Sequence, residues 1–411
     1  MSKKTEDYDV VIIGGGAAGL TAGIYCGRAK LKTLIIEKGL VGGLATYTNE
    51  IENYPGFPEG STGLGLMELF QKQAKKFGVT FKLTDVKSVD FGSGEIKIVE
   101  TFRNIYRAKA VIVASGGKPR LTGAKNEEKY LYDKGISFCA TCDAAANSGK
   151  TVMVVGSGDA SIEEGMFLTK FADKVIVSVI HDTGKMDCNE IAKAQALENP
   201  KMEFIWNTVV DSFEGEDHLE TVVLKNLKTN DLIPVKVDSC FLFIGYLPNT
   251  ELFKDVLDMN KAGYLQSNEK METNISGVFA AGDVRDKFLK QVATAVGDGA
   301  IAGYSAEKYI AESEVYNCQI LNEGRPSIVY VYNAIDPASR DLIEVIDSLE
   351  DRYGDRVRFT KIDVYKSDGL AKRLNVSDLP CAVLINNNEM VKVFTGESVS
   401  ADGIGECICQ V

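Results

Sequence analysis

The chain has 411 residues, enough for two or three domains, and its hydrophobic content of 45% is ordinary for a globular protein. Its net charge of -12 argues against nucleic acid as a partner, because phosphate binding needs a basic surface. It contains no run of about 18 uncharged apolar residues and it begins with a polar segment, so we expect no membrane span and a cytoplasmic location.

The first pattern in chain order is an apolar run, a glycine-rich turn, a helix-like stretch and a second apolar run, over residues 8–39. This order predicts a βαβ unit that binds a dinucleotide, with glycines that let the backbone approach a pyrophosphate at the helix N-terminus. The second run ends at an acid that can accept a hydrogen bond from a ribose hydroxyl. The residues concerned are Gly14, Gly16, Gly19 and Glu37.

A close pair of cysteines, Cys139 and Cys142, lies in the stretch FCATCDAAANSG at residues 138–149, directly ahead of Asp143. The chain has nine cysteines, an odd and scattered set that does not suit a secreted disulfide framework. Three interpretations are open: a redox dithiol, a structural disulfide, or half of a zinc site that Cys407 and Cys409 would complete. With only two histidines in the chain, a carboxylate is the better candidate for moving protons.

A second glycine turn follows at residues 151–182, again between an apolar run and a helix-like stretch. Gly156 and Gly158 fit the pattern, but the third position is Ser161, and the next apolar run ends near Asp182. A second nucleotide-binding domain is expected here, and a fold retained without a working site is the alternative.

The order of the apolar runs predicts an α/β protein with two Rossmann-like nucleotide-binding domains, one inserted in the other. The outer domain is expected at residues 1–116 and 246–312, and the inner domain, which carries the cysteine pair, at residues 117–245. Residues 313–326 are expected to be a linker or an edge strand. Residues 327–411 show the βαβαββ order of a thioredoxin-like domain.

Several motifs, in the right order, resemble those of the low-molecular-weight thioredoxin reductases, which are FAD-dependent flavoproteins. They are GGGAAGL at 14–20, TNEIENYPGFPEG at 48–60, CATCD at 139–143, AAGDV at 280–284 and KQVATAV at 290–296. The resemblance covers the first 312 residues and implies FAD binding, with Asp283 on the ribityl chain. The FAD-binding residues that it implies are Gly14, Gly16, Ala18, Gly19, Glu37, Gly43, Asn53, Gly282, Asp283, Gln291 and Val292.

The same resemblance implies roles for the cysteine pair. Cys142 would face the flavin, Cys139 would attack the disulfide of a thioredoxin-like protein, and Asp143 would act as acid and base. It also implies a homodimer, and an inner domain that rotates about hinges near Gly116–Pro119 and Gly245–Pro248.

The inner domain departs from the family where the electron donor would bind. Its turn reads GSGDAS at 156–161, and the segment at 181–185 reads HDTGK, where the family has an arginine-rich HRR segment. NADPH is therefore disfavoured, because a 2′-phosphate needs cations and Asp182 would repel it. NADH stays open, since a carboxylate can hold a free ribose hydroxyl. Ferredoxin is the other candidate donor, because some flavoproteins of this type have lost these motifs. The residues of this site would be Gly156, Gly158, Ser161 and Asp182.

The third domain lacks the cysteine pair of thioredoxin, whose CGPC motif would fall on residues 336–339. Pro380 matches the cis-proline of that family, and Cys381 follows it. Docking of a partner and support of a dimer are the expected roles. An alternative is a relay in which a flexible tail dithiol, Cys407 and Cys409, takes electrons from Cys139.

Two rival functions remain open at this point. The first is a flavin-binding docking or regulatory protein, against which the intact CATCD motif argues. The second is an NADH oxidase, or an electron donor for peroxide reduction.

Overall fold

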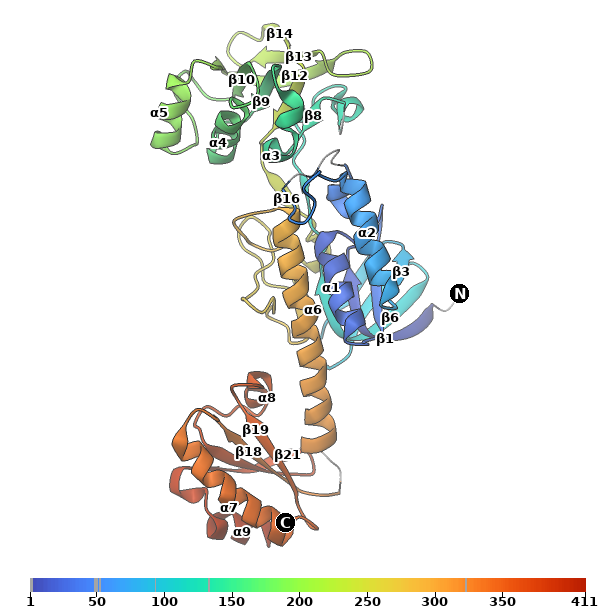
Figure 1. Cartoon of the computed structure of the whole chain (residues 1–411), viewed down its shortest axis with the longest axis vertical. Coiled ribbons are helices and arrows are strands. Elements are labelled where there is room, and N and C mark those ends of the chain that lie inside the picture. The colour runs from blue at the N-terminus through green and yellow to red at the C-terminus, as the bar shows by residue number, and fades with distance from the viewer. Residues whose placement is uncertain (1–2, 48–50, 52, 93, 132–133, 322–323) are drawn as a thin grey trace. The chain divides into compact units, whose positions relative to one another are not determined.

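The computed structural model describes residues 3–47, 51, 53–92, 94–131, 134–321 and 324–411, and it divides the chain into a unit of residues 1–304 and a unit of residues 305–411. Figure 1 shows the elements of both units. Among the described residues, no helix combines the length and the apolar composition needed to cross a membrane.

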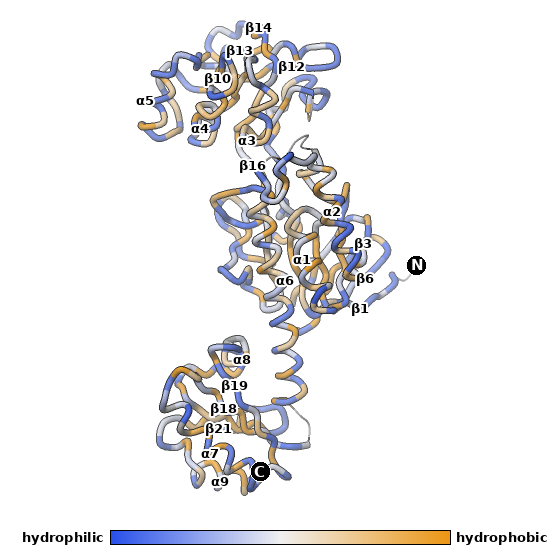
Figure 2. Tube along the Cα trace, in the orientation of Figure 1, coloured by the Kyte–Doolittle hydropathy of each residue, from blue (hydrophilic) through white to orange (hydrophobic). Residues whose placement is uncertain are grey.

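The first sheet of the larger unit is built on two long buried strands, β1 (Lys4–Ile13) and β6 (Asn104–Val113), which pair in parallel. β2 (Thr33–Glu37) and β3 (Thr80–Leu83) extend the sheet on one side, and β17 (Val278–Ala280) pairs with β6. β5 (Lys97–Thr101) and β4 (Val86–Asp90) complete it as antiparallel strands. The apolar runs that end β1 and β6 are continuous because parallel strands are normally covered on both faces, and Figure 2 colours the chain by hydropathy.

Three helices accompany this sheet: α1 (Ala17–Arg28), α2 (Gly63–Lys76) and α6 (Val292–Val315). α2 begins after Thr62, whose side chain accepts a hydrogen bond from the backbone N–H of Gly65 and so caps the helix. α1 meets α6 at glycines, since a Cβ on Gly299 would lie 2.2 Å from the carbonyl oxygen of Ala18. The close approach of these two helices therefore depends on the absence of a side chain.

A second sheet, of parallel strands, occupies the middle of the chain. Its order is β11 (Met202–Trp206), β10 (Lys174–Val179), β9 (Thr151–Val155), β15 (Ser239–Leu242) and β8 (Ile136–Ser137). Helices α3 (Ala140–Asp143), α4 (Asp159–Leu168) and α5 (Glu190–Glu198) belong to this part. Between β11 and β15 the chain forms a separate antiparallel sheet, with strands β12 (Thr208–Glu214), β13 (Thr221–Asn226) and β14 (Leu232–Lys236).

Two short segments pair at the expected ends of the inner domain. β7 (Gly117–Pro119) and β16 (Tyr246–Pro248) form an antiparallel ribbon, and these are the segments that we expected to act as hinges. Each is preceded by a glycine at positive φ, Gly116 at 64° and Gly245 at 106°. The chain thus enters and leaves the inner domain side by side, which fits the predicted insertion.

The smaller unit has a four-stranded mixed sheet in the order β19 (Arg358–Asp363), β18 (Ser327–Tyr332), β20 (Cys381–Asn386) and β21 (Glu389–Thr395). α7 (Pro337–Tyr353), α8 (Asp368–Arg373) and α9 (Ala401–Ile408) complete it, and the Leu379–Pro380 peptide bond is cis, as the resemblance implied.

The expectation of a linker or edge strand directly after residue 312 is wrong for its first half. α6 continues to Val315, and a π-helical turn, Tyr316–Ile320, follows it. Ile320 is fully buried in the apolar core of the smaller unit, beside Val315 and Leu321, and this burial explains why the segment is ordered as a helix.

Candidate active site

The first glycine turn is shaped for close backbone contact. Gly14 has a φ of 109°, and a Cβ there would lie 2.2 Å from the carbonyl oxygen of Ala114 on the neighbouring strand. A Cβ on Gly19 would lie 2.0 Å from the carbonyl oxygen of Gly14, so the turn and the first helical turn of α1 touch. Around Gly16, the N-cap of α1, the nearest atom to an added Cβ is 3.8 Å away. The N-terminus of α1 is therefore open to a ligand with a pyrophosphate group.

Glu37 lies at the end of β2, and one of its carboxylate oxygens contacts the glycine turn. Oε2 accepts a hydrogen bond from the N–H of Gly15 at 2.7 Å, and Oε1 accepts one from the N–H of Gly39 at 2.8 Å. A cavity of about 440 Å³ adjoins this carboxylate and is lined by residues from both segments of the outer domain, among them Gly14, Lys38, Ser115, Asn249 and Phe253. Its mixture of apolar and polar walls suits an adenosine group.

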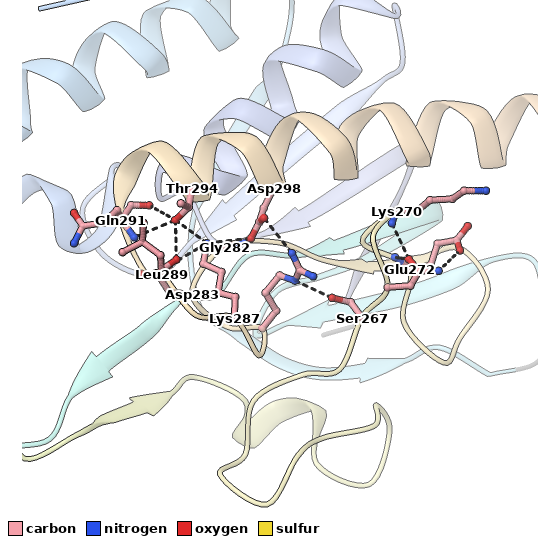
Figure 3. A network of polar contacts seen from close by, with 12 residues as sticks. Ser267, Lys270, Glu272, Gly282, Asp283, Lys287, Leu289, Gln291, Thr294 and Asp298 are labelled. Carbon is pink, nitrogen blue, oxygen red and sulfur yellow. Dashed lines mark hydrogen bonds and ion pairs between the residues drawn. The ribbon is translucent and has the colours of Figure 1, made fainter. Parts of the chain in front are cut away.

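Asp283 lies in a polar cluster after β17 (Figure 3). Its Oδ1 is buried and accepts no hydrogen bond, and the nearest cation, Lys287 Nζ, is 3.6 Å away. That lysine donates instead to Asp298 Oδ2 at 3.1 Å, and Arg285 donates to Asp298 Oδ1 at 3.1 Å. Burial raises the pKa of Asp283 above its ordinary value, against the opposing effect of Lys287. An unsatisfied buried acceptor of this kind fits a hydroxyl donor such as a ribityl chain.

The remaining residues of the expected FAD site surround the same region. Gly282 has a φ of 80°, and a Cβ there would lie 2.8 Å from the Cβ of Ala18. Asn53 Nδ2 donates to Gln291 Oε1 at 3.2 Å, although residues 48–50 and 52 of its loop lie outside the described residues. Val292 is the first residue of α6, and Gly43, with a φ of 62°, begins a short 3₁₀ helix. The residues present therefore fit FAD.

The cysteine pair is a disulfide between Cys139 and Cys142, with a Cα–Cα distance of 5.3 Å, and both residues are half-buried. Cys139 is the N-cap of α3. No group of three or more histidine, cysteine or acidic side chains suited to a metal ion occurs among the described residues, so nothing there supports the zinc interpretation.

Ser137, at the end of β8, connects the cysteine pair to the acid that follows it. Its hydroxyl donates to Asp143 Oδ2 at 2.5 Å and accepts a hydrogen bond from the N–H of Cys139 at 3.2 Å. The Asp143 carbonyl in turn accepts a hydrogen bond from Asn147 Nδ2 at 2.8 Å, and Asn147 Oδ1 accepts one from buried Ser239 on β15. Sequence reasoning missed Ser137 and Asn147. For Ser137 the only signal was its place two residues ahead of the motif.

The second glycine turn differs from the first at its third position. Gly156 has a φ of 133°, and Ser161 was predicted only as one residue of a possible nucleotide site. Its buried hydroxyl donates to the carbonyl oxygen of Phe243 at 3.0 Å, so this residue locks the turn to the end of β15 and is not placed to bind a ligand. Around Gly158, the N-cap of α4, no atom lies within 4 Å of an added Cβ.

Two carboxylates lie in the segment after β10, and one of them contacts this turn. Asp182 forms an ion pair with Lys228, and the hydrogen bond from that lysine lowers the pKa of the carboxyl. Asp187 Oδ2 lies 2.7 Å from His181 Nε2, whose hydrogen bond lowers the pKa of Asp187, and it accepts a hydrogen bond from Ser157 Oγ at 3.2 Å. Sequence reasoning missed Asp187, because its contact with the turn depends on how the loop after β10 folds back.

In the smaller unit, the expected tail dithiol is not on a flexible tail. Cys407 lies in α9 and Cys409 is the C-cap of that helix. Residues two apart on a helix point in different directions, and the half-buried Cys407 packs against the core and lies 3.3 Å from Lys392 Nζ. The idea of a flexible relay dithiol is therefore wrong in its structural premise.

The position of the missing CGPC motif has become a helix cap. Asp336 precedes α7, and its Oδ2 accepts hydrogen bonds from the N–H of Ser339 at 3.1 Å and from the Ser339 hydroxyl at 2.8 Å. Ser339 is fully buried, and its carbonyl oxygen accepts a hydrogen bond from Tyr330. Cys381, next to the cis-proline, is also buried, and burial raises the pKa of its thiol to about 11.

Comparison with known proteins agrees with this geometry. Residues 8–299 match the pyridine nucleotide-disulphide oxidoreductase family, and residues 307–409 match the thioredoxin family. A thioredoxin reductase of Peptoclostridium acidaminophilum is 42% identical over 309 residues, 74% of this chain and 97% of that protein. The thioredoxin reductase of Bacillus subtilis is 42% identical over 306 residues, 74% of this chain and 95% of that protein.

Solved structures give the same result. The thioredoxin reductase of Streptococcus pyogenes superposes with a TM-score of 0.69 at 38% identity, over 74% of this chain and 98% of that one. That of Giardia duodenalis gives a TM-score of 0.67 at 34% identity, over 74% of this chain and 99% of that one. The chain therefore belongs to the pyridine nucleotide-disulphide oxidoreductase family, and it is an FAD-dependent disulfide oxidoreductase of the thioredoxin reductase type that carries an additional C-terminal thioredoxin domain.

Proposed function

We propose that the enzyme passes electrons through FAD to the Cys139–Cys142 disulfide and on to the disulfide of a thioredoxin-like protein, with ferredoxin or NADH rather than NADPH as the donor. The single observation that carries this proposal is the half-buried disulfide with Asp143 hydrogen-bonded beside it, in a chain that also holds a fitted FAD site. A homodimer and a cytoplasmic location complete the proposal and stay predictions.

The residues divide the work as follows. The N-terminus of α1, Glu37 and Asp283 hold FAD, which supplies the conversion between hydride or single electrons and a dithiol. Once the pair is reduced, the Cys139 thiolate attacks one sulfur of the partner disulfide. A mixed disulfide forms, the partner's disulfide bond breaks, and the released partner thiolate takes a proton from Asp143.

The second exchange returns the pair to its oxidised form. Cys142 gives its proton to Asp143 and attacks the sulfur of Cys139. The Cys139–Cys142 disulfide forms, the mixed disulfide breaks, and the second partner thiolate leaves with a proton from Asp143. Two electrons have then passed from the dithiol to the partner.

The case against NADPH rests on charge at the second glycine turn. In this proposal a phosphorylated ribose approaches Asp182 and Asp187, and Asp187 already accepts the hydrogen bond of Ser157 in the turn itself. A 2′-phosphate would meet these two carboxylates and would have to compete with Asp182 for Lys228. Because Asp182 is held by Lys228, it is poorly placed to accept a ribose hydroxyl as well, and we therefore favour ferredoxin over NADH.

The test is an anaerobic spectral titration of the purified flavoprotein with NADPH, NADH and reduced ferredoxin in turn. We expect the flavin absorbance to be bleached by ferredoxin or NADH and not by stoichiometric NADPH. Bleaching by stoichiometric NADPH would contradict the proposal. The variant Asp187→Arg should lower the NADPH concentration needed for bleaching, whereas Asp217→Arg, at an exposed acid elsewhere in the inner domain, should not.

A further inference from the structure

The segment that carries the disulfide is anchored on both sides to one strand. Ser137 pairs with Phe241 of β15 at the end of the short strand β8. On the other side of the motif, Asn147 accepts a hydrogen bond from Ser239 of the same strand at 2.7 Å, with both side chains buried. The backbone around the cysteines is thus fixed at its two ends to the parallel sheet.

Within this frame, a serine hydroxyl donates a hydrogen bond to the Asp143 carboxylate. A serine hydroxyl has a single hydrogen, and the short contact of 2.5 Å assigns that hydrogen to Asp143 Oδ2. Ser137 Oγ itself accepts a hydrogen bond from the N–H of Cys139 at 3.2 Å, while the carbonyl oxygen of Cys139 lies farther from Oγ, at 3.4 Å. Ser137 therefore ties the position of the attacking cysteine to the rotation of the acid.

We infer that Ser137 is a positioning residue for disulfide exchange: it acts through Asp143 and holds that carboxyl group where it can give a proton to the leaving thiol. The inference rests on the proposed function of Cys139 and Asp143. Hydrogen bonds to a charged acceptor are short and strong, so loss of this hydroxyl should loosen the orientation of the carboxyl group. Proton transfer by a positioned group contributes about a hundredfold or more to a rate, and misplacement should lose about tenfold of it.

The test uses two small disulfides whose leaving thiols differ in their need for a proton. Hydroxyethyl disulfide releases an aliphatic thiolate of high proton affinity, whereas 5,5′-dithiobis(2-nitrobenzoate) releases an aromatic thiolate that is stable without a proton. The flavoprotein is reduced with dithiothreitol, desalted anaerobically and mixed with each disulfide. The protein thiols that remain are then alkylated and counted by mass after acid quenching.

We expect Ser137→Ala to slow the reaction with hydroxyethyl disulfide about tenfold and to leave the reaction with the aromatic disulfide within about twofold. Ser137→Thr, which keeps the hydroxyl, should restore the rate. Ser148→Ala, which removes an exposed serine hydroxyl in the following turn, is the matched control and should react like the unmodified enzyme.

A double-mutant cycle separates positioning from a general structural role. In the Asp143→Asn background, Ser137→Ala should not lower the rate further, because the carboxyl group through which Ser137 acts is no longer there. Equal slowing with both disulfides, or a full additional loss in the Asp143→Asn background, would overturn the inference. If the unmodified enzyme reacts with neither disulfide, it is the proposed role of Cys139 that fails, and this outcome is distinct from an equal reaction of Ser137→Ala and the unmodified enzyme.

Discussion

At the scale of single residues, the buried Asp283 carboxylate should lower the free energy of unfolding of the protein without FAD. A carboxylate oxygen that is buried without a hydrogen bond loses its hydration, and Lys287, which lies 3.6 Å away, is shared with Asp298. This unsatisfied oxygen lies at the position where a bound FAD would supply hydroxyl donors. The residue therefore contributes to binding at the expense of the stability of the empty protein.

The pH dependence of stability should show this cost. Because burial raises the pKa of Asp283, the group favours the folded state when it is protonated. Its contribution is full below its ordinary pKa and is lost as the pH rises through the raised value. In urea unfolding of the FAD-free protein, Asp283→Asn should gain more stability over the unmodified chain at about pH 7 than at about pH 4.

The same variant should hold FAD less tightly, since a charged acceptor makes hydrogen bonds roughly twice as strong as those of a neutral one. The flavin absorbance per chain after dialysis measures this effect. An equal stability difference at both pH values would show that Asp283 is not penalised by burial.

The sequence was sufficient for residues whose role follows from local pattern. Gly14 directly follows β1 and Glu37 ends β2, as predicted, while Asp283 comes three residues after the end of β17. It was insufficient for Ser137 and Asp187, whose significance depends on which side chain a loop brings beside them. It was misleading for Ser161, because pattern matching cannot tell a serine that faces a ligand from one that bonds to a neighbouring strand.

At the scale of elements, the contact of α1 with α6 depends on a glycine. A Cβ on Gly299 would lie 2.2 Å from the Ala18 carbonyl oxygen and 3.0 Å from the Cβ of Thr21, both on α1, the helix whose N-terminus would hold the pyrophosphate. The position of the cofactor's helix is thus fixed by packing some distance from the cofactor.

Two glycines of α6 give a matched pair of substitutions. Gly299→Ala should lower the free energy of unfolding by about 3 kcal/mol and reduce FAD retention, because α6 must move away from α1. Gly297→Ala has open space around its added Cβ, and it should be neutral or stabilising by up to about 1 kcal/mol through helix propensity. Urea unfolding of both variants and the flavin content of each provide the measurement. Equal effects of the two substitutions would refute the packing argument.

The element order was largely predictable, and the exception is instructive. The βαβαββ order predicted for the third domain is present, and helix α9, which the prediction did not include, follows it. The helical segment after residue 312 was not predicted, because Ile320 is buried by contacts with the domain that follows it, which local pattern does not show.

At the scale of the whole molecule, every residue placed in the FAD site and around the disulfide belongs to the unit of residues 1–304. A chain of residues 1–315, which keeps α6 intact, should therefore retain one FAD and reduce an aromatic disulfide within about twofold of the full chain. Full-length protein with Cys407→Ser and Cys409→Ser is the companion variant, and it should show unchanged turnover. Loss of FAD from the shortened chain would show that the smaller unit supports the flavin site.

The helix cap formed by Asp336 and Ser339 occupies the positions where thioredoxin has its two cysteines, and this bears on how many electrons the chain can store. FAD takes two electrons and the Cys139–Cys142 disulfide takes two, so the fully reduced chain holds roughly four. The thioredoxin domain adds none, because its former redox position is closed by a carboxylate and a hydroxyl and its remaining cysteines form no disulfide. Among the described residues no second disulfide is present to accept electrons from Cys139, so we expect each pair of electrons that leaves the dithiol to leave the chain.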